Sequence, residues 1–190
     1  MEKSLSDIVT IYAEATPNPE SMKFVANKML LPNDSADFRS PELAADGGAL
    51  VKTLFEMPFV KGVFVMNNFV SITKNEDYEW FDLIPDLRTF FTEWLEQGKE
   101  IVAIKVSLTP DQETEIERKI RQLLEDHVRP AVEMDGGAID FKSFKNGVVT
   151  VQMKGSCSGC PSSTMTLKAG IENLLKRMVP EVIAVEAESA

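Results

Sequence analysis

The 190-residue sequence predicts an α+β protein made of two small α/β domains. Two apolar, β-rich runs flank Asn67-Asn68 and two more flank Asn146-Gly147, a pattern typical of β-hairpins. Segments with helical spacing of apolar residues accompany each hairpin. The length suits one large or two small domains. We therefore place the first domain at 1–98, a connector at 99–109 and the second domain at 110–190.

The first domain is expected to begin with a strand over 8–15. Thr16-Pro17-Asn18-Pro19 ends that strand, because proline fixes its own φ and restricts the preceding residue. A second short strand is predicted over 22–26. The polar stretch 32–41 is predicted to be a loop.

A short helix over 50–57 is predicted next, and Pro58 ends it. The hairpin strands follow at 63–66 and 69–73. A helix over 86–97 then places its apolar residues on one face, with Gly98 as a plausible C-terminal cap. Its aromatic residues are interpreted as core. The first domain contains no cysteine, no histidine and no catalytic constellation.

The connector contains a possible strand over 101–106. Thr109, Pro110 and Gln112 are expected to form the capped start of a helix that runs to Val128 and must bend or end at Pro130.

Asp135-Gly136-Gly137 is interpreted as a tight turn. Alternating hairpin strands over 138–144 and 148–153 follow it. A second helix over 161–178 and a last strand over 182–187 complete the order α-β-β-α-β. The resulting unit of about 80 residues is large enough to fold alone.

Composition argues against several classes of function. The net charge of −10 leaves no basic face for nucleic acid. The most apolar short run, 101–104, is far too short to span a bilayer, so no membrane partner is expected. The N-terminal residues lack the apolar core of a signal peptide and are acidic, unlike a mitochondrial transit peptide. A reducing cytoplasm is therefore the expected location.

The two cysteines stand three residues apart, in Cys157-Ser158-Gly159-Cys160-Pro161. This CxxC loop is expected between a strand and the N-terminus of the second helix, where unpaired N–H groups and the helix dipole favour negative charge. The neighbouring residues are mostly serine and glycine, which allow backbone amides to approach sulfur atoms. The loop is the candidate metal or redox site of the chain.

Four interpretations compete for the pair. Two chains could share one iron–sulfur cluster or one zinc ion, because such sites need about four ligands and each chain supplies Cys157 and Cys160. A thioredoxin-like dithiol needs more strands after the CxxC helix than this chain offers. Two buried, inert thiols fit poorly with a Gly/Ser-rich loop. An in-chain zinc site lacks ligands, since His127 is the one histidine and lies on the other helix. Ligand count alone does not separate shared iron–sulfur from shared zinc.

The second half resembles the C-terminal domain of NifU and of Nfu-type proteins, through Asp135-Gly136-Gly137, the hairpin and Gly155 to Thr164. The first half resembles the N-terminal Nfu domain. There the likeness rests on Thr16-Pro17-Asn18-Pro19, Lys23-Phe24, Leu54-Phe55, Val63 to Lys74 and Trp80.

The resemblance implies a non-enzymatic scaffold or carrier that binds a [4Fe-4S] cluster between two subunits through Cys157 and Cys160. A homodimer would receive the cluster from upstream donors and pass it to apo iron–sulfur proteins. Target recognition is the implied role of the first domain. One departure is noted: Asp46-Gly47-Gly48-Ala49-Leu50 stands in place of the Ser-Pro-led helix start of that domain. The rival function is a dithiol oxidoreductase, with a dimeric structural zinc protein as a further alternative.

Overall fold

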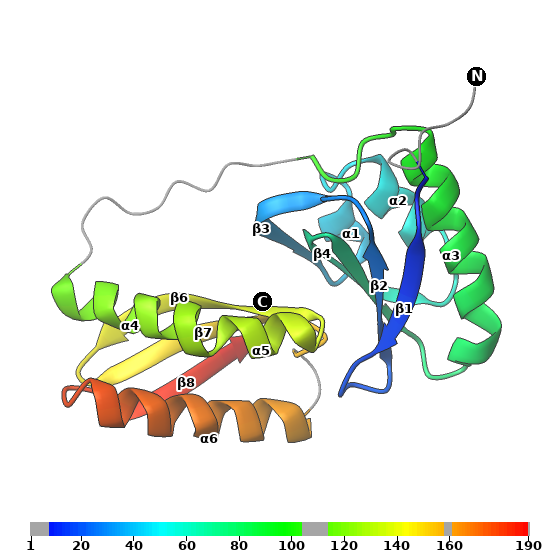
Figure 1. The fold of residues 1–190 in the computed structure, drawn as a ribbon. Helices are drawn as coiled ribbons and strands as arrows, with labels where there is room; N and C mark the ends of the chain where they lie inside the picture. Colours follow the sequence, from blue (N-terminus) through cyan, green and yellow to red (C-terminus); the bar gives the residue numbers. More distant parts are fainter. Residues whose placement is uncertain (1–7, 104–113, 158–160, 190) are drawn as a thin grey trace. The chain divides into compact units, whose positions relative to one another are not determined.

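The computed structural model describes residues 8–103, 114–157 and 161–189. The chain divides into two compact units, Met1–Ile104 and Lys105–Ala190. Each unit contains its own sheet, helices and apolar core (Figure 1).

The first unit has a five-stranded sheet in which every neighbouring pair is antiparallel. Two helices, α2 (Ala49–Phe55) and α3 (Trp80–Glu96), contribute to the core formed on one face of this sheet. The strands, in spatial order, are β1 (Ile11–Ala15), β2 (Ser21–Ala26), β5 (Phe69–Lys74), β4 (Val60–Asn67) and β3 (Leu31–Phe38).

The first hairpin prediction is confirmed. β4 and β5 pair through Met66 and Phe69 across the two-residue turn Asn67-Asn68. Asn67 adopts a positive φ of 47°, which asparagine tolerates better than most residues. Gly98, the predicted C-terminal cap of α3, also has a positive φ, of 63°.

The loop prediction for 32–41 is wrong, because most of that stretch is strand β3. β3 lies at an edge of the sheet and pairs with β4 alone. An edge strand tolerates polar residues, and an irregularity in the pairing between Leu31 and Ser35 breaks its alternation. The stretch therefore lacked the apolar period-2 pattern by which a strand is identified.

Helix α3 starts at Trp80, six residues before the predicted start, and includes Pro85. A proline inside a helix costs one backbone hydrogen bond. The first turn is held by the side chain of Trp80, whose indole N–H donates to the carbonyl of Pro19 at 2.9 Å. This long-range contact has no signature in the local sequence.

At the segment Asp46 to Leu50, helix α2 begins after Gly48 without a Ser-Pro start. A Ser-Pro-led helix start is present earlier, in α1 (Pro41–Ala44). The Ser40 side chain caps that helix by accepting a hydrogen bond from the backbone N–H of Leu43.

The described part of the expected connector belongs to the first unit and does not form a strand. Residues 101–103 have no regular secondary structure, and Ile101 and Val102 pack against the first core. The Ala103 N–H donates to the carbonyl of Gly47 at 3.3 Å. The remainder of the predicted strand, 104–106, lies outside the described residues.

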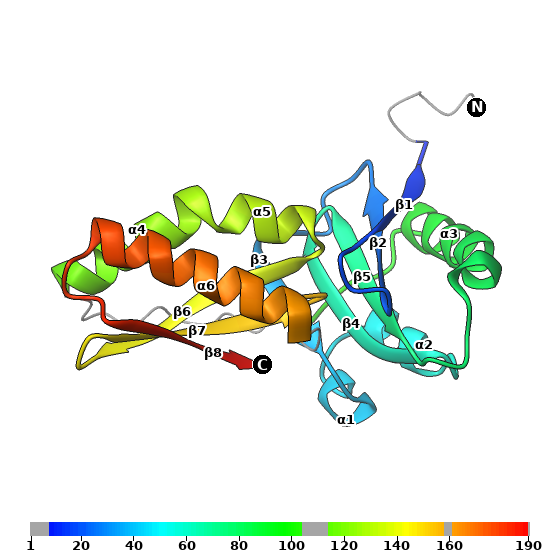
Figure 2. The same cartoon turned by 90° about the horizontal axis from the view of Figure 1, so that it is seen from below.

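The second unit has a three-stranded sheet of order β6-β7-β8, in which β6 and β7 are antiparallel and β8 runs parallel to β7. Its helices cover one face of the sheet (Figure 2). The core side chains of β7, at Val149, Val151 and Met153, alternate along the strand. The elements are α4 (Glu115–His127), α5 (Arg129–Met134), β6 (Gly137–Lys145), β7 (Val148–Gly155), α6 (Pro161–Met178) and β8 (Ala184–Ser189).

The first helix of this unit is capped later than expected. Thr109, Pro110 and Gln112 lie outside the described residues, and the capping box is formed by Thr114 and Glu117. The backbone N–H and the hydroxyl of Thr114 both donate to the Glu117 carboxylate, which lowers the pKa of that carboxyl group. The ionised Glu117 carboxylate therefore stabilises the fold above the ordinary pKa of glutamate. This contribution is lost as the pH falls through the lowered pKa.

Helix α6 agrees with the predicted bounds of 161–178 and carries the chain from β7 to β8. Glu172 on α6 fixes the position of β8, because its carboxylate accepts the backbone N–H of Val185 at 3.1 Å. The same carboxylate accepts a hydrogen bond from Lys176 at 2.6 Å. Both hydrogen bonds lower the pKa of Glu172, and the bond from Lys176 has the larger effect.

The turn of the second hairpin yields a test of the fold. Gly147 has a φ of 81°, and a Cβ there would lie 2.6 Å from Cδ1 of Ile183. We expect Gly147→Ala to destabilise the second unit by about 2–4 kcal/mol, from left-handed strain and overpacking together. Gly98→Ala is the matched control: its φ is 63°, but its Cβ would meet nothing within 4 Å. It should cost the first unit only about 1–2 kcal/mol. Thermal unfolding followed by calorimetry gives both values, and equal losses would contradict the close approach of Ile183.

Candidate metal centre

Cys157 follows the end of β7 by two residues and precedes helix α6. Its partner in the predicted pair, Cys160, lies outside the described residues. We expected both thiols to lie outside the apolar core, and for Cys157 that expectation is wrong. Its exposed fraction is 5%, and it belongs to the core cluster of the second unit. The Gly/Ser-rich surroundings suggested an exposed loop, but the residue next to β7 remains close to the sheet.

The Cys157 sulfur lies directly against Gly137, the first residue of β6. A Cβ at Gly137 would be 2.9 Å from the Cys157 Sγ and 2.6 Å from the carbonyl oxygen of Lys154. Both distances are shorter than any normal contact of a Cβ, so a side chain at position 137 would displace the thiol or the strand. Glycine at this position is a requirement of the site.

The start of the cysteine loop is bound to the Asp135-Gly136-Gly137 turn by Ser156, which is 2% exposed. The Ser156 hydroxyl donates to the carbonyl of Asp135, and the Ser156 N–H donates to the carbonyl of Gly136 at 3.3 Å. Gly136 has a φ of 78°, as the tight turn requires. The turn predicted from the sequence is therefore a structural part of the candidate site, which sequence reasoning did not identify.

Helix α6 holds the cysteine from the other side. The hydroxyl of Thr164, in the first turns of α6, donates to the carbonyl of Cys157 at 3.1 Å. The backbone of Cys157 is thus fixed between the Ser156 contacts and the helix. Such second contacts keep a ligand side chain oriented for a metal.

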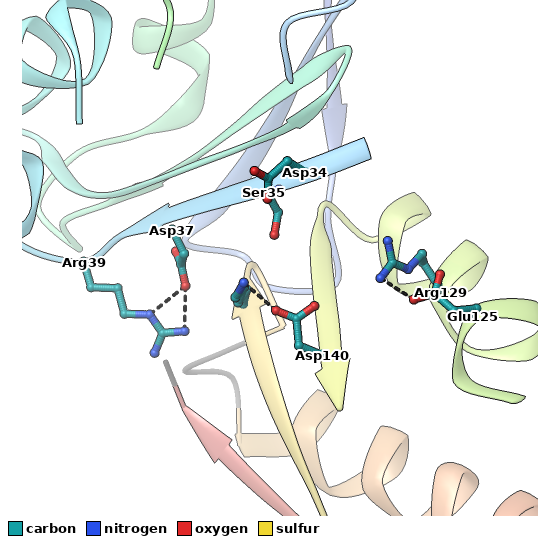
Figure 3. Close-up of polar contacts among 8 residues, drawn as sticks. Asp34, Ser35, Asp37, Arg39, Glu125, Arg129 and Asp140 are labelled. Atoms are coloured by element: carbon teal, nitrogen blue, oxygen red, sulfur yellow. Dashed lines mark hydrogen bonds and ion pairs between the residues drawn. The ribbon is translucent and has the colours of Figure 1, made fainter. Parts of the chain in front are cut away.

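One ion pair joins the two strands of the hairpin that carries the loop. The Lys154 ammonium lies 2.5 Å from the Asp140 carboxylate on the neighbouring strand (Figure 3). Arg129 at the start of α5 pairs with Glu125 at 2.5 Å. In the first unit, Arg39 makes a two-nitrogen contact with Asp37, at 2.9 and 3.0 Å. The first two pairs are partly exposed and each contributes little stability, whereas the Asp37 carboxylate is buried.

The described residues do not form a complete metal site within one chain. No three side chains of His, Cys, Asp or Glu gather there in a way that could hold a metal ion. His127 is the last residue of α4 and is not part of such a group. A metal ion at Cys157 would need ligands from outside the described residues of this chain, and the whole sequence has one other cysteine. In the part of the chain that the structure describes, no helix is both long and apolar enough to cross a membrane.

Comparison with known proteins defines the class. Residues 11–98 match the family described as "Scaffold protein Nfu/NifU N terminal", and residues 120–186 match the "NifU-like domain". The chain therefore belongs to the Nfu family of iron–sulfur cluster scaffold proteins.

The human and Arabidopsis relatives agree with this assignment. Over 180 residues the chain is 37% identical to the human "NFU1 iron-sulfur cluster scaffold homolog, mitochondrial", covering 93% of this chain and 70% of the relative. It is 37% identical to "NifU-like protein 4, mitochondrial" of Arabidopsis thaliana, covering 94% and 65%. The chain thus spans about two thirds of the length of these relatives. A solution structure of a NifU-like protein from Saccharomyces cerevisiae is 20% identical, with a TM-score of 0.47 over 55% of this chain and 93% of that one.

The contact between Gly137 and Cys157 can be tested. Gly137→Ala should lower the iron bound after anaerobic reconstitution by at least about tenfold, because the thiol must move, and should destabilise the unit by about 1–3 kcal/mol. The matched control is Gly62→Ala in strand β4, where a Cβ would make ordinary contacts, the shortest at 3.5 Å to Thr73. That variant should bind iron as the unmodified protein does. Full iron content in Gly137→Ala would show that the close approach does not position the thiol.

Proposed function

We propose that this protein is a carrier that binds a [4Fe-4S] cluster as cargo between two copies of the chain and delivers it to apo-proteins. The observation that carries the proposal is the number of soft ligands. The sequence has two cysteines, Cys157 and Cys160, and a cluster of this type is held by about four thiolates. Membership of the Nfu family makes an iron–sulfur cluster the preferred cargo over zinc.

The surroundings of Cys157 suit a thiolate ligand. Gly137 leaves no side chain between the sulfur and the backbone, while Ser156 and Thr164 hold the loop at two points. Backbone amides that approach sulfur closely stabilise a negatively charged cluster. In this proposal Cys157 and Cys160 bind the cargo, and the small residues around them shape its electrostatic environment.

Shared ligands give a route for release. When two copies separate, each retains half of the thiolates, so the cluster loses half of its protein ligands in one step. An apo-protein that offers a full set of cysteines then binds the cluster more strongly. This division of ligands favours a carrier over an electron-transfer protein or an enzyme. Upstream donors and apo iron–sulfur clients are the proposed partners, and the net charge of −10 disfavours nucleic acid.

The location is proposed to be a reducing compartment, where both thiols stay free. The cytoplasm is one such compartment, and the two relatives compared above carry "mitochondrial" in their names. Either location fits the proposed chemistry. A dithiol oxidoreductase and a dimeric zinc protein use the same CxxC pair and remain the alternatives.

Iron stoichiometry tests the proposal. Anaerobic reconstitution with iron and sulfide should yield a brown protein with about four iron atoms per two chains, and loading should convert monomers to dimers. Metal analysis, Mössbauer spectroscopy and sedimentation measure these properties. A monomer with full iron content would exclude a shared site, and a colourless protein would favour zinc or the dithiol.

Cysteine variants test whether Cys157 is a cluster ligand or an inert core residue. Cys157→Ala and Cys160→Ala should each abolish stable cluster binding, because each removes two of the four ligands from a dimer. Cys157→Ala should also cost the apo-protein about 1 kcal/mol, since its sulfur is part of the core. Full cluster loading of Cys157→Ala, with only stability reduced, would identify Cys157 as a structural core residue.

The first unit is proposed to recognise client proteins. It contributes no cysteine, and its described residues form no metal-ligand group. We expect full-length protein to transfer its cluster to a natural client several-fold faster than residues 105–190 at equal loading, while both load equally. Circular dichroism first checks that the fragment is folded. Equal transfer to several clients would leave a stabilising role for the first unit.

A further inference from the structure

Two exposed methionines are the sequence neighbours of residues that hold Ser156 and Cys157 in place. Met134 is 75% exposed and ends α5, next to Asp135, whose carbonyl accepts the Ser156 hydroxyl. Met165 is 73% exposed and follows Thr164, whose hydroxyl binds the Cys157 carbonyl. The C-terminal end of α5 and the N-terminal end of α6 lie at the same end of the second unit (Figures 1 and 2). Two large apolar side chains are thus exposed next to residues that hold Ser156 and Cys157.

Met165 begins an uncharged exposed face of helix α6. The exposed residues of α6 from Met165 to Asn173 include no ionisable side chain, although charged residues make up 26% of the chain. Lys168 and Glu172, which lie between them in sequence, are half-buried. Charged residues occur elsewhere on α6, at half-buried positions or near its C-terminal end, as in Lys176 and Arg177. We call Met134 together with this part of α6 the methionine face. Its α6 members are Met165, Thr166, Ala169, Gly170 and Asn173.

The glycine at position 170 is a second observation that points to a protein partner on this face. A glycine in the middle of a helix costs about 1 kcal/mol relative to alanine. A Cβ at Gly170 would meet nothing within 4 Å, so no group among the described residues requires glycine there. The close approach of another backbone is a physical reason for a glycine at an open position.

We propose that the methionine face is the surface on which a second copy of this chain docks when the cluster is shared, an inference that rests on the proposed function. The site is incomplete without the second copy, whose cysteines must reach the same cluster. The surfaces that flank the loop are then brought together. In a two-fold interface the same patch serves both copies.

The chemistry of the face suits that partner. Methionine is enriched in protein interfaces and charged residues are depleted at their cores. Its flexible side chain adapts to the surface that it meets. Each copy carries a net charge of −10, so an uncharged contact brings two like-charged chains together without placing carboxylates opposite each other.

Lysine substitutions test the face in the full-length protein. Met165→Lys should weaken cluster-dependent dimerisation by at least about tenfold, because a charge is buried without a partner. Met178→Lys is the matched control, since Met178 is 42% exposed and lies at the other end of the same helix. Sedimentation of anaerobically reconstituted protein, with iron determination, measures the association.

Two further variants distinguish a loss of docking from charge repulsion by the cluster and from a change in stability. Met165→Glu should weaken the dimer as Met165→Lys does; weakening by glutamate alone would indicate repulsion from the cluster charge and overturn the inference. Gly170→Gln should raise the thermal midpoint of the apo-protein, because glutamine is the better helix former, and yet weaken the dimer at least about tenfold. A stabilised variant that dimerises normally would contradict close approach at this position.

The outcomes distinguish the two proposals. If unmodified protein forms a cluster-bound dimer and Met165→Lys does the same, the docking inference fails and the proposed function stands. If Met165→Lys loads and dimerises normally but transfers its cluster more slowly, the face contacts a client rather than a second copy, and the inference is overturned. If unmodified protein takes up no iron, or holds four iron atoms as a monomer, the proposed function fails and the docking inference fails with it.

Discussion

The close approach of Gly137 to Cys157 is the constraint on which the candidate site depends. It requires a residue without a side chain at the first position of β6 and places the sulfur against the backbone of the sheet. The Asp135-Gly136-Gly137 turn and the cysteine loop are thereby one structural unit, although about twenty residues separate them. Ser156 and Thr164 then fix the loop from the turn and from α6. The rigid hairpin between turn and loop supplies the frame that both share.

The burial of Cys157 sets a condition on the proposed role. A thiol that is 5% exposed in one chain is shielded from water, so cluster binding requires the loop to bring this sulfur to the surface that a second copy meets. One chain alone cannot complete a four-thiolate site, so stable binding depends on association. The uncharged methionine face beside the loop gives that association a location. Ligand number therefore supports the proposed function, and the surface inference builds on it.

The sequence predicted the elements whose signals are local. Asn146-Gly147 marked the second hairpin, and Pro161 and Pro180 bracketed the α6 helix. The predictions failed where contacts between residues far apart in the sequence determine the local structure. Polar strand β3 is held at the edge by β4, and the start of α3 is held by the Trp80–Pro19 hydrogen bond. The cysteine pair was visible as a spacing, but the burial of Cys157 and the role of Gly137 depend on β6 and β7 lying side by side.

The parallel pairing of β8 with β7 has a consequence for the order in which the second unit folds. β6 and β7 join through a two-residue turn, whereas β8 must wait for all of α6 to cross back over the sheet. Contacts between residues far apart in sequence form more slowly than local ones. The cysteine loop is the first part of that crossover, so its anchoring by Thr164 requires α6 to be in place. A chain that has formed only the hairpin holds an unfinished ligand site, and maturation of the site is coupled to the slowest step of folding.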